Sequence, residues 1–204
     1  MKFLKIFLVL IFVLFVAGSM NSFAVITGSA HDFSNDAWNS SSQICLPCHT
    51  PHNANATYKP LWNHAITAST FTVYSNSSMD ATVGQPDGAS KLCLSCHDGT
   101  VALGSYGGAT GTTMITGTAL LGTDLSNDHP VSFTYDAALA TTDGELYNPT
   151  TANSGLGGTI AADMLESGKV QCSSCHDVHN TANVAKLLVK TNAASALCLT
   201  CHNK

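Results

Sequence analysis

Apolar and polar positions divide the chain into a short apolar start and a long, mostly polar remainder. Two lysines precede an almost unbroken apolar run over residues 6–17, and Ser-Phe-Ala follows at 22–24. This order is typical of a secretory signal peptide. A membrane-spanning helix needs about 20 apolar residues, so an uncleaved anchor is the weaker alternative. We therefore expect residues 1–24 to be a signal peptide and residues 25–204 to be the mature chain.

The mature chain has few periodic stretches. Alternating apolar residues predict short strands over 71–74 and 131–135, and short helices are expected over 161–167 and 184–189. Glycine, serine, threonine and asparagine are abundant between these stretches, which is typical of loops. We expect a mostly irregular, coil-rich chain with a small aliphatic core, so something other than its own apolar side chains must organise it.

The mature chain is acidic. Its sequence has no arginine, and two of the eight lysines lie in residues 1–24, so six lysines face thirteen aspartates and glutamates. Nucleic acid is bound mainly by basic side chains that neutralise phosphates. We therefore expect no nucleic-acid partner, and we expect an exported protein that is not integral to a membrane.

All eight cysteines occur in four copies of Cys-x-x-Cys-His. On one turn of helix, residues three apart share a face, so both thiols can form thioethers with one haem. The histidine that follows can be the proximal iron ligand. We expect four covalent haem c groups, at the first (45–49), second (93–97), third (172–176) and fourth (198–202) motif. The expected thioether residues are Cys45, Cys48, Cys93, Cys96, Cys172, Cys175, Cys198 and Cys201, and the expected proximal ligands are His49, His97, His176 and His202.

Disulfides and zinc sites are two other possible roles for the cysteines. A disulfide scaffold would explain their even number in an exported chain, but it would not explain why a histidine follows every pair. Zinc can be held by cysteine and histidine at such spacings, but zinc sites would not require the same five-residue unit four times. Haem attachment explains both features.

Five further histidines are candidates for the distal iron ligands. Because their number so nearly matches four open iron positions, each is a stronger candidate than an isolated histidine would be. Three methionines, at 79, 114 and 164, could also ligate iron, but the supply of histidine makes them weaker candidates. The distal candidates are His31, His52, His64, His129 and His179.

His52 and His179 each follow a proximal histidine by three residues. Side chains three apart on a helical turn point the same way, whereas the two axial ligands of one iron approach from opposite faces. Neither histidine should therefore ligate the haem of its own motif. We expect His52 to ligate the haem of the second motif and His179 that of the fourth.

The chain contains an internal repeat, over approximately residues 31–97 and 129–202. Each half holds a leading histidine, a Cys-x-x-Cys-His-x-x-His segment and a plain Cys-x-x-Cys-His. By this symmetry, His129 should ligate the haem of the third motif and His31 that of the first. His64 has no counterpart in the second half, and it is the alternative ligand for the first motif. His31 would then be free to ligate a haem of a neighbouring subunit.

Longer runs carry a more particular signal than the motifs alone, above all Leu-Trp-Asn-His at 61–64 and Ser-Lys-Leu-Cys-Leu-Ser-Cys-His-Asp-Gly-Thr at 90–100. Together with residues 31–34, 45–52, 71–74 and 129–132, these runs resemble the OmcE-like family of filament-forming tetrahaem cytochromes. The resemblance implies four stacked haems, each iron ligated by two histidines, inside an irregular polypeptide. It also implies head-to-tail assembly of this chain with itself into an extracellular filament, with one distal histidine, most readily His31, donated across the subunit boundary.

Two histidine ligands on each iron would leave no position for a substrate, so the expected function is electron transfer rather than catalysis. We expect a secreted protein at the cell surface or outside the cell, exchanging electrons with redox proteins or extracellular acceptors. One alternative is a monomeric periplasmic or outer-surface electron shuttle. Another is a multihaem reductase, which needs a vacant iron position; all four motifs end in histidine, which weakens that reading.

Overall fold

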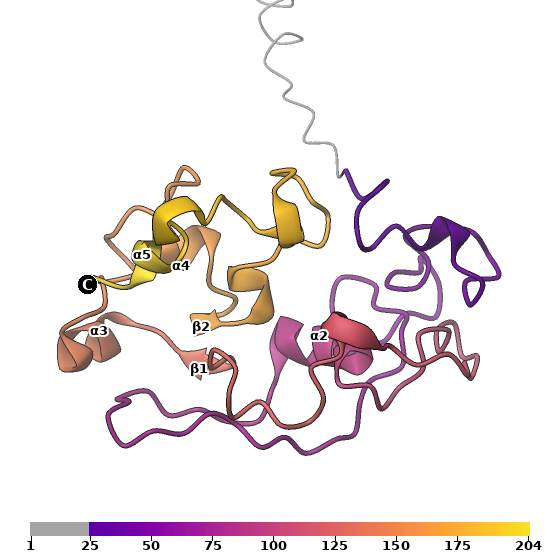
Figure 1. Ribbon diagram of the computed structural model, residues 1–204, viewed down its shortest axis with the longest axis horizontal. Coiled ribbons are helices and arrows are strands. Elements are labelled where there is room, and N and C mark those ends of the chain that lie inside the picture. Colours follow the sequence, from indigo (N-terminus) through magenta and orange to yellow (C-terminus); the bar gives the residue numbers. More distant parts are fainter. Residues whose placement is uncertain (1–24) are drawn as a thin grey trace, which may run out of the picture.

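A computed structural model describes residues 25–204, and most of this part of the chain is loop and turn (Figure 1). The expected signal peptide lies outside the described residues. Among residues 25–204, no helix is long and apolar enough to span a membrane. The expectation of a coil-rich chain with few short elements is confirmed. The helices and strands are α2 (Gly88–His97), β1 (Phe133–Thr134), α3 (Ala137–Asp143), α4 (Ile160–Asp163), β2 (Lys169–Val170) and α5 (Cys198–Cys201).

Residues 25–204 also contain five single turns of 3₁₀-helix, at Phe33–Asn35, Gly117–Ala119, Cys172–Ser174, Ala185–Leu187 and Ala193–Ser195. Figure 1 shows α3, α4 and α5 together on one side of the molecule, with α2 on the other side of the β1–β2 pair. The two strands are antiparallel, with Phe133 opposite Val170 and Thr134 opposite Lys169. This pair is the largest sheet in the described chain.

The predicted elements are partly correct. The strand expected over 131–135 contains β1, and the helix expected over 161–167 overlaps α4. The strand expected over 71–74 forms only one bridge, between Thr72 and Asp124, because no second strand lies beside it. The helix expected over 184–189 is wrong. Lys186 and Leu187 have φ values of 64° and 55°, which belong to the left-handed region and cannot continue an α-helix.

Helix α2 is the longest helix described and carries the second motif at its C-terminal end. Its first residue, Gly88, has a φ of +47°, and a Cβ there would lie 3.0 Å from the Gln171 side-chain nitrogen. Glycine is therefore required where the helix begins against the other half of the chain. The helix buries Ser90, Leu94 and Ser95, and small serines allow neighbouring backbone to approach closely.

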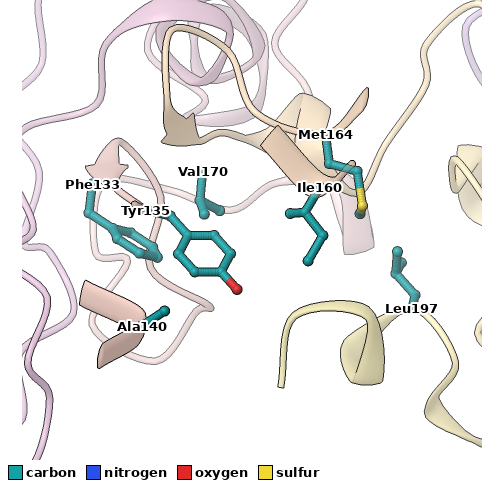
Figure 2. Close-up of a cluster of buried hydrophobic side chains, with 7 residues drawn as sticks. All are labelled: Phe133, Tyr135, Ala140, Ile160, Met164, Val170 and Leu197. Carbon is teal, nitrogen blue, oxygen red and sulfur yellow. The ribbon is translucent and has the colours of Figure 1, made fainter. Parts of the chain in front are cut away.

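The apolar core is small and lies mainly in the second half of the chain (Figure 2). In Figure 2, Ile160 of α4 and Met164 just after it lie between the β1–β2 region and Leu197 beside α5. Because Met164 is buried among apolar side chains, its place is explained by packing. The complete cluster is Phe133, Tyr135, Ala140, Ile160, Met164, Val170 and Leu197, and a second cluster in the first half is Phe71, Leu94 and Leu125.

A polar network joins the two halves of the chain just before α2. Asp87 accepts hydrogen bonds from Lys169 and, at 2.8 Å, from the Gln171 side-chain amide. The Ser132 hydroxyl donates to Gln171 at 3.0 Å and accepts from the Asp87 backbone N–H at 3.0 Å. Burial alone would raise the pKa of Asp87, but the hydrogen bonds from Lys169 and Gln171 outweigh it and lower the pKa below its ordinary value. We call this network the inter-half joint.

The inter-half joint continues into the third motif. The Cys172 N–H donates to the Ser90 hydroxyl of α2 at 3.0 Å, and the Ser90 N–H donates to Gln171 at 3.2 Å. As a result, the helix that carries the second motif packs directly on the turn that carries the third. The fold therefore positions two of the four candidate sites against each other.

Candidate haem-attachment sites

All four motifs adopt one helical turn, as the spacing predicts. In the first, third and fourth motif, the histidine N–H donates to the carbonyl of the first cysteine at 2.9, 3.0 and 3.0 Å. The second motif forms the last turn of α2. This turn places the two thiols of a motif on the same face. No disulfide joins any of the eight cysteines in the described structure.

The first and third motif share a local structure beyond that turn. After His49 the backbone becomes extended, and the Asn63 N–H donates to the Cys48 carbonyl at 2.9 Å. After His176 it does the same, with the Val189 N–H donating to the Cys175 carbonyl at 3.0 Å. The first and third motif are therefore followed by the same backbone hydrogen bond.

Backbone carbonyls orient three of the four proximal candidates. The Nδ1 atom of His49 lies 2.8 Å from the Pro60 oxygen, and that of His97 lies 2.7 Å from the Ala119 oxygen. The Nδ1 atom of His176 lies 3.0 Å from the Lys186 oxygen. A carbonyl can only accept, so Nδ1 carries the proton and Nε2 is left for a metal. The Cys-x-x-Cys-His pattern contains no signal for these carbonyls, which lie 10 to 22 residues further along the chain.

Three proximal candidates each face a second histidine ring. The ring centroids are 6.1 Å apart for His31 and His97, and 6.1 Å apart for His49 and His179. For His129 and His202 they are 6.4 Å apart. Two metal–imidazole bonds of about 2 Å and two half-rings add up to about 6 Å, which is the separation expected of two axial ligands on one iron.

These pairs differ from the pairs expected from the sequence. His179 lies opposite the first motif, not the fourth, and His129 lies opposite the fourth motif, not the third. His31 lies opposite the second motif, inside its own chain, not opposite the first or a neighbouring subunit. In each half of the chain, the leading histidine lies opposite the second motif of that half. Ligation itself stays a prediction for all of these histidines.

The reason for the difference lies just after the motifs. The expected pairing treated each Cys-x-x-Cys-His-x-x-His segment as helical through its last histidine. In the structure the helical turn ends at the proximal histidine. The Thr50 N–H donates to Leu61 and the Asp177 N–H donates to Leu187, so both segments turn away from the helix axis. His179 thereby reaches the first motif instead of the fourth.

His64 and His52 take different positions from these three. His64 is only 4% exposed, and its ring nitrogens lie 2.8 Å from the Ala65 oxygen and 3.3 Å from the Leu103 oxygen. It packs beside the second motif, 3.5 Å from the Cys96 sulfur, and does not face His49 as a first-motif ligand would. His52 is exposed. Within residues 25–204, no ring pair like the three above includes His52 or His176.

The surroundings of His31 suit a metal ligand. Its buried Nδ1 has no hydrogen-bond partner in the described part of the chain, and an unpartnered buried nitrogen is costly unless something coordinates it. Burial, and then the charges of His97, His176 and His179, lower the pKa of His31 to about 4. The ring is therefore neutral near pH 7, as a ligand must be.

The thiols of the four motifs follow one another through the molecule in chain order. Burial, then the Cys45 thiol, raises the pKa of Cys48 to about 11, and burial, then Cys48 and Asp98, raises that of Cys96 to about 12. Cys93 and Cys172 share a hydrogen bond, which raises the pKa of Cys93 and lowers that of Cys172. Burial, then Cys175, raises the pKa of Cys201 to about 11. Neighbouring motifs are thus close enough for their thiols to interact.

The donor set fits haem better than zinc. In the part of the chain that the structure describes, no three histidine, cysteine or acidic side chains converge to hold a metal ion. A zinc site needs three or four such ligands from the protein. Haem supplies four nitrogens of its own, so it needs only an axial pair of histidines and a pair of thiols, which is what the first, second and fourth motif offer.

Comparison with known proteins agrees with this chemistry. A family model described as the doubled CXXCH motif (Paired_CXXCH_1) matches residues 165–204, which contain the third and fourth motif. No curated protein is significantly similar to the chain. The match supports a multihaem c-type cytochrome family, and it indicates covalently bound haem c and a role in electron transfer.

Proposed function

We propose that the chain carries four haem c groups, one at each motif, and passes electrons along them. The observation that carries this proposal is the set of three facing histidine pairs, each at the separation of two axial ligands on one iron. Bound at these sites, haem supplies an iron that gains and loses single electrons. The chain attaches the group through thiols and fills both axial positions with histidine.

Filled axial positions favour electron transfer over catalysis. At the first, second and fourth motif, both faces of the site are occupied by imidazole, so a substrate would have to displace a histidine. The contact between Cys93 and Cys172 supports a continuous chain of groups across the two halves. A reductase would need a vacant position at one iron, and within residues 25–204 only the third motif has no facing ring.

The intact mass of the purified native protein tests the haem count. We expect the mass of the polypeptide plus four haems, with every haem resistant to acid extraction because thioethers are covalent. In a matched variant with Cys93→Ala and Cys96→Ala, one haem should be lost. A native mass without added haem, or lowered by eight hydrogens from four disulfides, would contradict the proposal.

We further propose that the protein is secreted and assembles with itself into an extracellular filament. His176 lacks a facing ring within residues 25–204, while exposed His52 has no ring partner there. A second copy could therefore supply His52 to the third motif of the first. A head-to-tail contact of this kind gives a fibre when the rotation from one copy to the next does not close into a ring. The resemblance to filament-forming tetrahaem cytochromes supports the same assembly.

Electron micrographs of the native protein from the outside of the cell test this second proposal. We expect filaments of uniform width. Single particles of one subunit, in the periplasm or on the surface, would support a monomeric electron shuttle instead.

A further inference from the structure

Asp98 is a buried carboxylate directly after the second motif. Its residue is 4% exposed, although charged side chains are almost never buried without compensation. Apolar packing does not explain why a carboxylate lies here. No lysine or arginine in the described residues forms an ion pair with Asp98. The compensation comes from hydroxyl and backbone donors.

Only donors surround the two oxygens of Asp98. The Thr67 hydroxyl donates at 2.5 Å, the Thr100 N–H at 2.7 Å and the Thr100 hydroxyl at 2.9 Å. The same two hydroxyls face Ser69, whose N–H donates to Thr67 at 3.1 Å and whose hydroxyl donates to Thr100 at 3.2 Å. An ionised carboxylate accepts the bonds from Thr67 and Thr100, so the site is built for a negative charge.

This charge acts on the second motif. Asp98 follows His97 directly in sequence, and its N–H donates to the Leu94 carbonyl of α2 at 2.9 Å, so the carboxylate lies at the end of the turn that carries the motif. The Thr67 N–H also donates to Ser95 inside the motif at 3.1 Å, so the carboxylate cluster is fixed to the same turn. A fixed negative charge in a buried site stabilises the more positive, oxidised state of a nearby metal group.

We propose that Asp98, held by Thr67 and Thr100, lowers the reduction potential of the haem at the second motif. The inference rests on the proposed haem attachment. Asp98 is a positioning and tuning residue, because it acts on the iron through space and through the turn that carries His97. The potential of the second site is thereby set below that of an equivalent site without the carboxylate.

The other motifs offer an internal comparison. The first and fourth motif are followed by the neutral residues Thr50 and Asn203. The third is followed by Asp177, whose side chain is 20% exposed and lies beside His179. Water screens an exposed charge more than a buried one, so Asp98 should have the larger effect.

The test is an NMR redox titration of the haem-loaded protein, in which the haem methyl signals of each site report its own oxidation. In Asp98→Asn, which keeps the shape of the side chain, the potential of the second haem should rise and the other three should change less. Exposed Asp124 provides the matched control, because Asp124→Asn removes the same charge and should leave all four potentials unchanged. A second-site potential that stays at the control value, or falls, overturns the proposal.

A second pair of variants keeps the test decisive if Asp98→Asn does not accumulate. Thr67→Val retains the charge but removes a compensating hydroxyl, so at pH 8 the second-site potential should fall, whereas Thr67→Ser should leave it unchanged. Equal potentials in both variants overturn the tuning role. Failure of the unaltered chain to load haem would instead refute the proposed function, so the two failures are distinguishable by mass and visible spectrum.

Discussion

At the residue scale, the chemistry of this chain depends on which histidines face each other. The motif residues are local in sequence, and their helical turn could be predicted from spacing alone. The facing pairs could not, because His31 and His97 are brought together by the whole fold of the first half. His179 reaches the first motif from the opposite half, and no sequence spacing encodes that contact. The symmetry of the pattern therefore could not predict which rings lie together, and ligation by these histidines stays a prediction.

Replacing His31 with alanine should convert one of the four haems from low-spin to high-spin in the isolated subunit, since His97 would lose its facing ligand. In an isolated subunit the third motif has no facing ring, so three haems are low-spin and about a third of the low-spin EPR signal should disappear; added imidazole should restore it. The measurement needs no filament, because both rings belong to one chain.

His64→Ala is the matched control for that variant, because His64 is also buried but both of its ring nitrogens already face carbonyl oxygens. It should leave the number of low-spin haems unchanged. The assignment would be wrong if His64→Ala produced a high-spin haem and His31→Ala did not.

At the element scale, short helices and turns are held together by polar contacts more than by an apolar core. The sequence correctly predicted that the chain has little regular structure, because glycine-rich and serine-rich stretches cannot bury a large core. It gave no sign of the inter-half joint, since Asp87 and Gln171 are 84 residues apart and neither belongs to a recognisable motif. Such side-chain networks become visible only when the halves are folded against each other.

Gln171→Ala should destabilise the junction between α2 and the third motif. The substitution leaves the buried Ser132 hydroxyl and the buried Ser90 N–H each without one hydrogen-bond partner, and an unsatisfied buried polar group costs about 1–3 kcal/mol. The midpoint of chemical denaturation, followed by near-UV circular dichroism, should fall accordingly. Gln43→Ala, at an exposed glutamine, should leave it unchanged.

The inter-half joint should also weaken in acid. The pKa of Asp87 is lower in the folded chain than its ordinary value of 3.8, so its contribution is present above pH 4 and is lost as the pH falls through the folded pKa. Between pH 5 and pH 7, Asp87→Asn should be less stable than the unaltered chain by a constant amount. Toward pH 3 that difference should shrink. A difference that grows in acid would contradict the sign of the shift.

At the scale of the whole molecule, the described chain pairs three proximal histidines and leaves the third motif without a facing ring. The surplus of five distal candidates over four sites suggested from the sequence that one ligand could cross to another subunit. The structure changes which residue is suited to that role, because His31 is turned inward and His52 is exposed.

His52→Ala should therefore abolish filaments while leaving four covalent haems on each subunit. Micrographs of the purified variant would show whether filaments remain, and intact mass would confirm the haem count. Asn53→Ala, one residue further along the same exposed turn, is the control and should still assemble. Normal filaments from His52→Ala would remove His52 from the subunit contact.

The most direct test of the histidine pairing, on which the proposed electron path depends, is a cryo-electron microscopy map of the native, haem-loaded protein. We predict four haems in the order of their motifs, with iron between His31 and His97, between His49 and His179, and between His129 and His202. A map in which His179 ligates the haem of the fourth motif, or in which any of these three pairs does not share an iron, would contradict the account.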